Sequence, residues 1–104
     1  MPSSTRLLME RYYVYTLLSL SDKKFYTGLT NNLKRRLQEH ARGEVKSTKN
    51  RRPLKLIHYE YFIDKNDAEA KEIFLKSGFG RNQFKIAIKK TLIAFLDKTS
   101  YNSQ

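Results

Sequence analysis

An arginine and a histidine four residues apart are the residues of this chain best suited to phosphate chemistry. Arg36 and His40 lie in the stretch NNLKRRLQEH, and at this spacing their side chains share one face of a helix. A guanidinium binds phosphate through two parallel hydrogen bonds, and an imidazole with a pKa of about 6.5 exchanges protons near neutral pH. A histidine at a helix edge is, however, more often a surface or packing residue.

A basic segment follows this pair. From Glu44 to Arg52, four cations lie among small polar residues, which is typical of an exposed loop. Such cations bind the backbone of a nucleic acid and give affinity with little sequence information. An ordinary solvated charge run explains the composition about as well. The four cations are Lys46, Lys49, Arg51 and Arg52.

The whole chain is strongly basic. Its 104 residues contain 21 Lys and Arg against 10 Asp and Glu, a formal charge of +11. A field of this sign attracts polyanions by displacing their counterions, so nucleic acid is the first partner to expect. Charge alone fits a generally basic surface equally well. Since the chain has no cysteine, a metal would have to bind through oxygen or imidazole.

Length and composition predict one globular domain. Hydrophobic residues make up 39% of the chain, enough to bury a core, and we expect a single domain over residues 1–104 with its core at roughly 12–96. No apolar run approaches the roughly 20 residues of a membrane span, and the N-terminus lacks the apolar stretch of a secretory signal. We therefore expect a cytoplasmic, soluble protein with no membrane partner.

A β-hairpin should carry the first part of the chain. The segments from Tyr12 to Leu18 and from Phe25 to Leu29 are rich in β-prone residues and are separated by Ser and Asp turn residues, so they should pair as antiparallel strands. Gly28 lies inside the second segment. Because glycine weakens a strand, its presence indicates a bend or a close backbone approach.

A helix should follow and position Arg36 and His40. It should begin at Asn31 or Asn32, whose side chains cap free N–H groups, and run to about Arg42 before Gly43. The expected buried stripe consists of Leu33, Leu37 and Ala41.

The second half predicts one more strand and two helices. Leu54 to Ile63 should form a strand covered on both faces, and Asn66 with Glu69 resembles a capping box that opens a helix ending near Ser77 and Gly78. A third helix should start at Arg81. The order ββαβαα predicts an α/β (α+β) fold, with a small three-stranded antiparallel sheet flanked by helices. The last helix should bear Phe84, Ile88, Leu92 and Phe95 at helical spacing.

Two short motifs resemble those that name the GIY-YIG nuclease family. Tyr13-Val14-Tyr15 and Tyr26-Thr27-Gly28 lie in the two predicted strands, and the order YVYTLL, YTGLT, NNLKRRLQEH follows the family's spacing. The stretch AEAKEIFLKSGFGR is similar to the single-domain bacterial members, so the resemblance covers roughly residues 12 to 95. Tyr13 stands where the first motif usually has glycine.

The resemblance implies a GIY-YIG fold and an endonuclease that hydrolyses phosphodiester bonds in DNA with Mg²⁺ or Mn²⁺. RNA as the substrate stays open, and so does structure-selective cutting of the repair or recombination type. Two other functions compete: a nucleic-acid binding module that has lost turnover, and an accessory subunit that a protein partner directs to its substrate. The family's active-site asparagine has no clear counterpart, because Asn82 is out of register.

The resemblance also implies roles for particular residues. Tyr26 would take a proton from water or orient it, with Tyr15 as its companion, and either phenol could equally be an ordinary strand residue. Arg36 would hold phosphate and His40 would shuttle a proton. Arg35, on the outer face of the helix, joins the four loop cations as a predicted nucleic-acid contact, and His58 has no motif match.

Glu72 is the carboxylate that the resemblance implies for the metal. Hard cations such as Mg²⁺ often need only one or two carboxylates, with water and phosphate oxygens as the other ligands. Glu72 faces away from the stronger apolar stripe, as a solvated residue would. Ala68 and Leu75 flank it on its own face, however, so that face could instead line a cleft, and the resemblance favours a functional Glu72. The stronger stripe comprises Ala70, Ile73 and Phe74.

Overall fold

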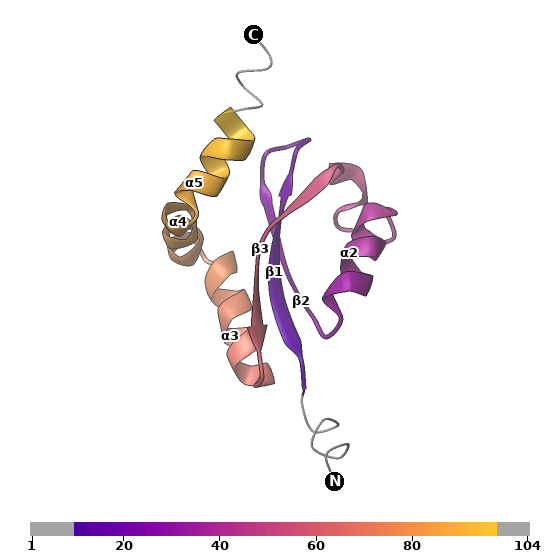
Figure 1. The fold of residues 1–104 in the computed structure, drawn as a ribbon, viewed down its shortest axis with the longest axis vertical. Helices are drawn as coiled ribbons and strands as arrows, with labels where there is room; N and C mark the ends of the chain where they lie inside the picture. The colour runs from indigo at the N-terminus through magenta and orange to yellow at the C-terminus, as the bar shows by residue number, and fades with distance from the viewer. Residues whose placement is uncertain (1–9, 98–104) are drawn as a thin grey trace. The chain divides into compact units, whose positions relative to one another are not determined.

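The computed structural model describes residues 10–97 (Figure 1). Contacts divide the chain into two compact units, of which the first ends at Glu72 and the second begins at Ile73. The first unit holds β1 (Tyr12–Ser19), β2 (Phe25–Thr30), α2 (Leu33–Ala41), the short 3₁₀ turn η1 (Lys49–Arg51), β3 (Leu54–Phe62) and most of α3 (Lys65–Lys76). The predicted ββαβα order and the α+β class are confirmed.

Strand β1 is the centre of the antiparallel sheet, whose order is β2-β1-β3. The register pairs Tyr15 with Gly28 of β2 and with Tyr59 of β3, so these three residues share one face. In Figure 1, α2 lies on one side of the sheet and α3 on the other. Both faces of β1 are therefore buried, which explains its nearly continuous apolar run.

Strand β3 is less covered than its sequence predicts. It is an edge strand, and Tyr59 and Tyr61 are 52% and 44% exposed. Both tyrosines pair with β1 residues of the Tyr15 face. The expectation that both faces of this strand are covered is therefore wrong, because the buried side of α2 contacts β1 and β2 instead.

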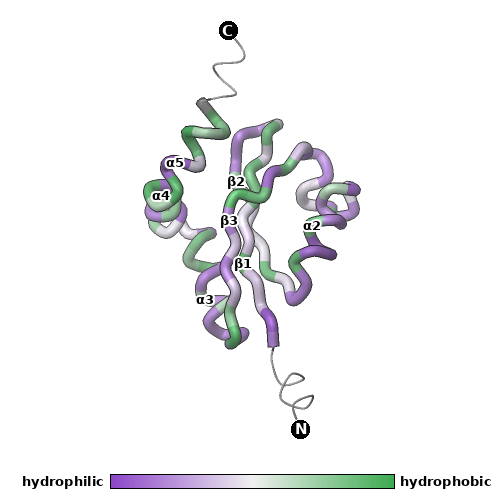
Figure 2. Tube along the Cα trace, in the orientation of Figure 1, coloured by the Kyte–Doolittle hydropathy of each residue, from purple (hydrophilic) through white to green (hydrophobic). Residues whose placement is uncertain are grey.

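Helix α2 has the predicted bounds but a different buried side. Asn32 is the N-cap, since its Oδ1 accepts a hydrogen bond from the Arg35 amide at 3.0 Å. Gly43 adopts φ +77° just beyond the helix, a conformation that other residues rarely take. The buried α2 residue is His40, whereas the expected stripe is half-buried or, at Ala41, exposed. Figure 2 shows α2 as mainly hydrophilic.

Helix α3 begins at Lys65, before Asn66, the first residue of the predicted capping box. The Asp64 side chain accepts the Asn66 amide at 2.7 Å, so Asp64 rather than Asn66 caps this end. Ala68 is fully buried and Glu72 is half-buried, while Ala70 is exposed. Of the two alternatives for this helix, the solvated Glu72 face is therefore wrong: the side that bears Ala68 is buried, whereas Ile73 and Phe74 of the stronger apolar stripe are exposed.

The second unit is helical. Helix α4 (Gly78–Ala87) begins after Ser77, whose Oγ accepts the Gly80 amide, and so precedes the predicted start at Arg81. A break at Ile88 separates it from α5 (Lys89–Leu92), which continues as the π-helical turn η2 (Ile93–Asp97). One uninterrupted third helix was therefore a wrong expectation. No helix within residues 10–97 has the length and apolar content to cross a membrane.

The cap of α2 gives a test that separates two neighbouring asparagines. Asn32→Ala should lower the free energy of unfolding by about 1 kcal/mol, because it leaves an N-terminal amide without its acceptor. Asn31→Ala should have a smaller effect, since the Asn31 side chain accepts a hydrogen bond from the Arg35 guanidinium, at 3.5 Å, rather than from a helix amide. Urea unfolding followed by circular dichroism measures both, and equal losses would contradict the assignment of the cap.

Candidate active site

A buried chain of hydrogen bonds forms the centre of the candidate site. Tyr15 Oη lies 2.8 Å from His40 Nε2, and His40 Nδ1 lies 2.8 Å from Thr48 Oγ1. None of the three residues is more than 2% exposed. One proton arrangement satisfies every contact: Tyr15 donates to Nε2, Nδ1–H donates to Thr48, and the Thr48 hydroxyl donates to the Val45 carbonyl at 3.4 Å.

The His40 imidazole is neutral at pH 7. The pKa of His40 is lowered to about 4, mainly by burial and also by the positive charge of Arg36, while the carboxylate of Glu39 opposes the shift. A neutral ring has one donor and one acceptor nitrogen, as the proton arrangement above requires. His40 therefore accepts a hydrogen bond from the Tyr15 hydroxyl and carries no charge of its own.

The phenol of Tyr15 also keeps its proton. Its pKa is raised to about 12, mainly by burial, while a hydrogen bond with Arg36 opposes the shift and the negative charge of Glu72 adds to it. Buried neutral groups thus form the base of the site.

Tyr26 and Arg36 lie above this base and are more accessible. The Tyr26 ring centroid is 5.2 Å from that of His40 and 6.4 Å from that of Tyr15. Tyr26 is half-buried, and the Arg36 side chain is 36% exposed with one guanidinium nitrogen 3.0 Å from Glu39 Oε1. Hydrogen bonds to Glu39 and Tyr15 raise the pKa of Arg36, so this cation is held in place.

The structure brings together four of the five side chains that the sequence selected for catalysis or metal binding: Tyr15, Tyr26, Arg36 and His40. The fifth, Glu72, is half-buried on α3, and its negative charge contributes to the raised pKa of Tyr15. Their individual roles stay a prediction. His58, which the sequence gave no catalytic role, lies on the other face of the sheet, with Nε2 3.6 Å from Glu60.

Gly28 allows the Tyr15 hydroxyl to reach His40. A methyl group at Gly28 would lie 2.6 Å from Tyr15 Oη, closer than any real side chain atom approaches. The expectation of a close approach at this glycine is confirmed, with a phenol as the neighbour rather than another backbone. The second motif therefore contributes the space that the tyrosine of the first motif occupies.

The basic segment after α2 is anchored, not freely solvated. Val45 and Thr48 are buried, and Thr48 is hydrogen-bonded to His40 of α2, whereas Lys46 and Lys49 are exposed. Among the residues with described side chains, neither lysine takes part in an ion pair. These two cations are thus available to a polyanion.

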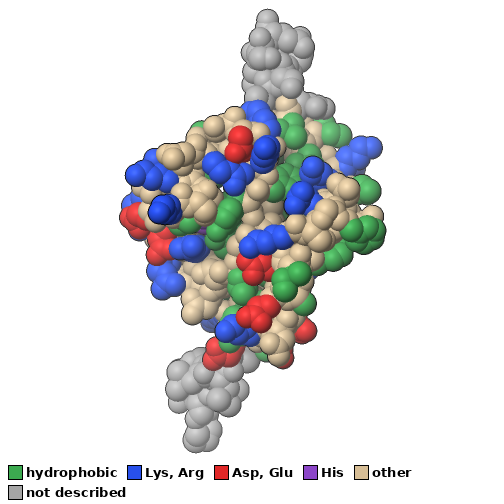
Figure 3. Space-filling model, turned by 180° about the vertical axis from the view of Figure 1, so that it is seen from behind, with side chains coloured by type: hydrophobic (Ala, Val, Ile, Leu, Met, Phe, Trp, Pro, Cys, Tyr) green, Lys and Arg blue, Asp and Glu red, His purple; other side chains and the backbone are tan. Residues whose placement is uncertain are grey.

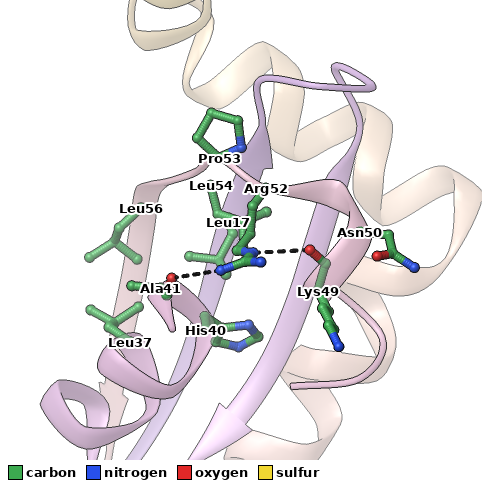
Figure 4. Close-up of a pocket in the computed structure, with 10 residues that line it drawn as sticks. All are labelled: Leu17, Leu37, His40, Ala41, Lys49, Asn50, Arg52, Pro53, Leu54 and Leu56. Carbon is green, nitrogen blue, oxygen red and sulfur yellow. Dashed lines mark hydrogen bonds between the residues drawn. The ribbon is translucent and has the colours of Figure 1, made fainter. Parts of the chain in front are cut away.

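The predicted nucleic-acid arginines have partners within the protein. Arg51 forms an ion pair with Asp22 at 2.7 Å, and Arg35 lies 3.7 Å from Glu39. The Arg52 guanidinium donates to two backbone carbonyls, those of Lys49 and Ala41 (Figure 4). Each arginine thus has a structural contact, and contact with nucleic acid stays a prediction for all three.

The cavity beside Arg52 does not provide the substrate site. It measures about 520 Å³, and leucines of β1, α2 and β3 form part of its lining, with the His40 ring at its wall (Figure 4). Of the five residues predicted for catalysis or metal binding, His40 alone lines this cavity. Tyr26, Arg36 and Glu72 lie outside its lining, so a phosphate bound there would not meet them.

A metal would meet few protein ligands in this site. Within residues 10–97, no three His, Asp or Glu side chains are grouped in a way that could hold a metal ion. Glu72 nevertheless fits Mg²⁺, which commonly binds one or two carboxylates and keeps several waters. Asn82, the out-of-register asparagine, is exposed on α4 in the second unit.

The family model described as the GIY-YIG catalytic domain matches residues 11–85. The chain belongs to the GIY-YIG family. It is 42% identical over 72 residues to a UPF0213 protein of Clostridium perfringens, which covers 68% of this chain and 75% of that protein. It is also 39% identical over 82 residues to a UPF0213 protein of Limosilactobacillus reuteri, covering 76% and 84%.

A solved relative belongs to the same group. The solution NMR structure of a UPF0213 protein from Bacillus halodurans is 34% identical, covers 71% of this chain and 81% of that chain, and has a TM-score of 0.47. The names of these relatives state no activity. GIY-YIG membership places the chain in a nuclease family, and the activity itself has to be argued from the site.

Thr48 is the site residue that sequence reasoning missed. It lies in a polar run eight residues after His40, among lysines and a serine, and no periodicity or motif distinguishes it there. Its importance comes from the fold, since the anchored segment turns its hydroxyl to within 2.8 Å of His40 Nδ1. Only the tertiary structure shows that this GIY-YIG histidine has two neutral hydrogen-bond partners.

The low pKa of His40 predicts acid sensitivity of the folded state. In the unfolded chain this histidine binds a proton near pH 6.5, whereas in the folded chain it does so only near pH 4. Its contribution to stability is therefore complete above about pH 6.5 and falls as the pH drops to about 4, by up to about 3 kcal/mol. Urea unfolding at a series of pH values measures this loss.

A matched pair of variants identifies the histidine responsible. His58→Gln should keep the steep fall in stability between pH 6.5 and 4, while His40→Gln should be less stable at neutral pH and should lose most of that fall. If both variants retained the fall, the pH dependence would arise elsewhere and the neutral buried imidazole would be wrong.

Proposed function

We propose that this protein is a divalent-metal-dependent endonuclease that hydrolyses phosphodiester bonds in DNA. The observation that carries the proposal is the cluster of two phenols, a guanidinium and an imidazole formed by Tyr15, Tyr26, Arg36 and His40. The carboxylate of Glu72 adds to it through its effect on the pKa of Tyr15. Phosphodiester hydrolysis requires positively charged groups that stabilise the developing phosphorane-like state, and a positioned water molecule. Groups of these types are present in the cluster.

The accessible residues are the ones suited to contact the substrate. Arg36, held by Glu39 and Tyr15, would bind the scissile phosphate and stabilise its charge in the transition state. Tyr26, half-buried and in contact with His40, would orient the attacking water through its hydroxyl. Both roles need side chains at the surface of the cluster.

The buried residues would act through the accessible ones. Tyr15 is only 1% exposed, so its hydroxyl cannot reach a phosphate and would instead fix the Tyr26 ring and the Arg36 guanidinium. His40, hydrogen-bonded to Tyr15 and Thr48, would hold the Tyr15 hydroxyl in a single orientation. This arrangement supports positioning roles for two residues that the motif alone would make proton carriers.

Glu72 would hold Mg²⁺ or Mn²⁺, and the bound ion would supply a Lewis acid and neutralise charge on the phosphate and leaving oxygens. The carboxylate also separates the candidate functions. A module that only binds nucleic acid gains nothing from an anion beside its phosphate site, because the two repel each other. The influence of Glu72 on Tyr15 therefore favours a nuclease over a binding module.

The proposal is tested by cleavage assays with Mg²⁺ on branched, duplex and single-stranded DNA and on RNA. Glu72→Gln removes the negative charge at nearly constant size, and we expect it to lower the cleavage rate by about 100-fold or more. Binding of the same substrate should change little, because the basic surface is intact. Fluorescence anisotropy without metal measures the binding.

Glu69→Gln is the matched control for this substitution. Glu69 lies on the same helix, is half-buried, and is 3.9 Å from Lys65, so its loss should leave cleavage nearly unchanged. Full activity in Glu72→Gln would remove this carboxylate from the mechanism. Binding without cleavage of any substrate by the wild-type protein would instead support the binding module.

The exposed lysines of the anchored segment predict a change in the salt dependence of binding. Lys46→Gln and Lys49→Gln should each reduce the slope of log affinity against log salt by up to about one unit, because each removes one phosphate contact. Lys65→Gln serves as the control, since Lys65 already pairs with Glu69 on α3. Anisotropy titrations at several salt concentrations measure the slope. Unaltered slopes in both lysine variants would mean that these side chains are solvated and do not contact the nucleic acid.

A further inference from the structure

Three exposed or half-exposed tyrosines form a cluster that the proposed chemistry does not use. The Tyr13 ring centroid lies 6.3 Å from that of Tyr59 and 5.5 Å from that of Tyr61. Tyr13 stands where the first motif of the family usually has glycine, so the cluster accounts for this departure. Tyr59 and Tyr61 are about half exposed, which leaves aromatic surface facing solvent.

A recess lies between this cluster and helix α2. It measures about 520 Å³, within the range of roughly 300–1,000 Å³ of small-molecule sites. Leu33 and Leu37 of α2 form one wall, and Tyr13 and Tyr59 of the sheet form the other. We call it the α2/β3 groove. Its rim carries Arg11, Asn31, Asn32 and Lys34.

The charge of the rim identifies the occupant. Within residues 10–97, Arg11 and Lys34 are exposed and take part in no ion pair, so the groove combines aromatic and apolar walls with uncompensated positive charge. A protein or second copy of this chain with an apolar surface would leave these two cations buried without a partner. An unpaired nucleotide brings both a flat apolar base and a phosphate. Figure 3 shows Lys and Arg side chains spread over one face of the molecule.

We propose that the α2/β3 groove binds unpaired nucleotides of the nucleic-acid substrate, next to the candidate active site. The proposal rests on the proposed function, since it concerns the same substrate. Bases stack on tyrosine rings only when they are not stacked in a duplex, so the groove selects single-stranded segments. Arg11 and Lys34 bind the phosphates that join these nucleotides.

The register of the sheet places the groove beside the catalytic cluster. Tyr13 and Tyr15 are two residues apart on β1 and share one face, at a separation of about 7 Å along the strand. Tyr59 is the β3 partner of Tyr15 in the ladder. Nucleotides in the groove would therefore flank a phosphate held near Tyr26 and Arg36.

Binding of labelled oligonucleotides without divalent metal tests the proposal. The probes are a short single strand and the blunt duplex of the same sequence. Tyr59→Ala should weaken single-strand binding by about 10-fold and duplex binding by less than about 2-fold, because only unpaired bases use the ring. Tyr59→Phe keeps the ring and should bind like the wild type. Ile63→Ala, an exposed apolar position beyond the end of β3, is the second control.

Each other outcome overturns the proposal. Unchanged single-strand binding in Tyr59→Ala, or equal losses for both probes, would exclude recognition of unpaired bases. A wild-type dimer that Tyr59→Ala converts to a monomer would assign the groove to a second copy of the chain. Because no probe is cut in these assays, failure of the groove is distinguishable from failure of the proposed nuclease activity, which the Mg²⁺ cleavage panel measures separately.

Discussion

The hydrogen bond between Tyr15 and His40 is the constraint on which the rest of the candidate site depends. It joins the central strand of the sheet to the buried side of α2 across 25 residues of sequence. Both groups are fully buried, so an unmet hydrogen-bonding group on either would cost free energy. The bond therefore fixes the rotation of α2 about its axis, and with it the direction in which Arg36 points. Gly28 below the phenol and Thr48 behind the imidazole are needed for the same bond.

The site separates into a buried neutral layer and an accessible charged layer, and the physical reason is desolvation. Burial disfavours the charged forms of Tyr15 and His40, which shifts their pKa values in opposite directions and leaves both neutral at pH 7. Arg36 and Glu72 keep more contact with solvent. Charge is thus placed where a phosphate and a cation can approach, and rigidity is placed beneath it. The sequence motif does not reveal this division, because it specifies residue types but not how deeply each side chain is buried.

Local patterns predicted what local physics determines. The hairpin, the bounds of α2 and its asparagine cap follow from β-propensity and capping, and the structure confirms them. The side of a helix that becomes buried is set by its tertiary partners. For α2 the sequence favoured an apolar stripe, whereas a ring with two hydrogen-bond partners, His40, is buried instead. For α3 the stronger apolar stripe includes Ala70, although the buried residue is Ala68, on the side of Glu72. The role of Thr48 and the exposure of β3 also depend on tertiary contacts, so the sequence did not indicate them.

Helix α2 is also what allows so small a basic protein to carry two kinds of surface. One side of the helix presents Arg36 and His40 to the tyrosines of β1 and β2, and another presents Leu33 and Leu37 to the α2/β3 groove. Arg36 and Leu37 are consecutive residues, so their side chains lie about 100° apart around the helix axis. The two sides are therefore adjacent and cannot move independently. A change that rotates α2 would alter the phosphate site and the groove together. The coupling explains why the helix is held by a side-chain cap at Asn32, a glycine at its end and a buried polar contact in its last turn, rather than by apolar packing alone.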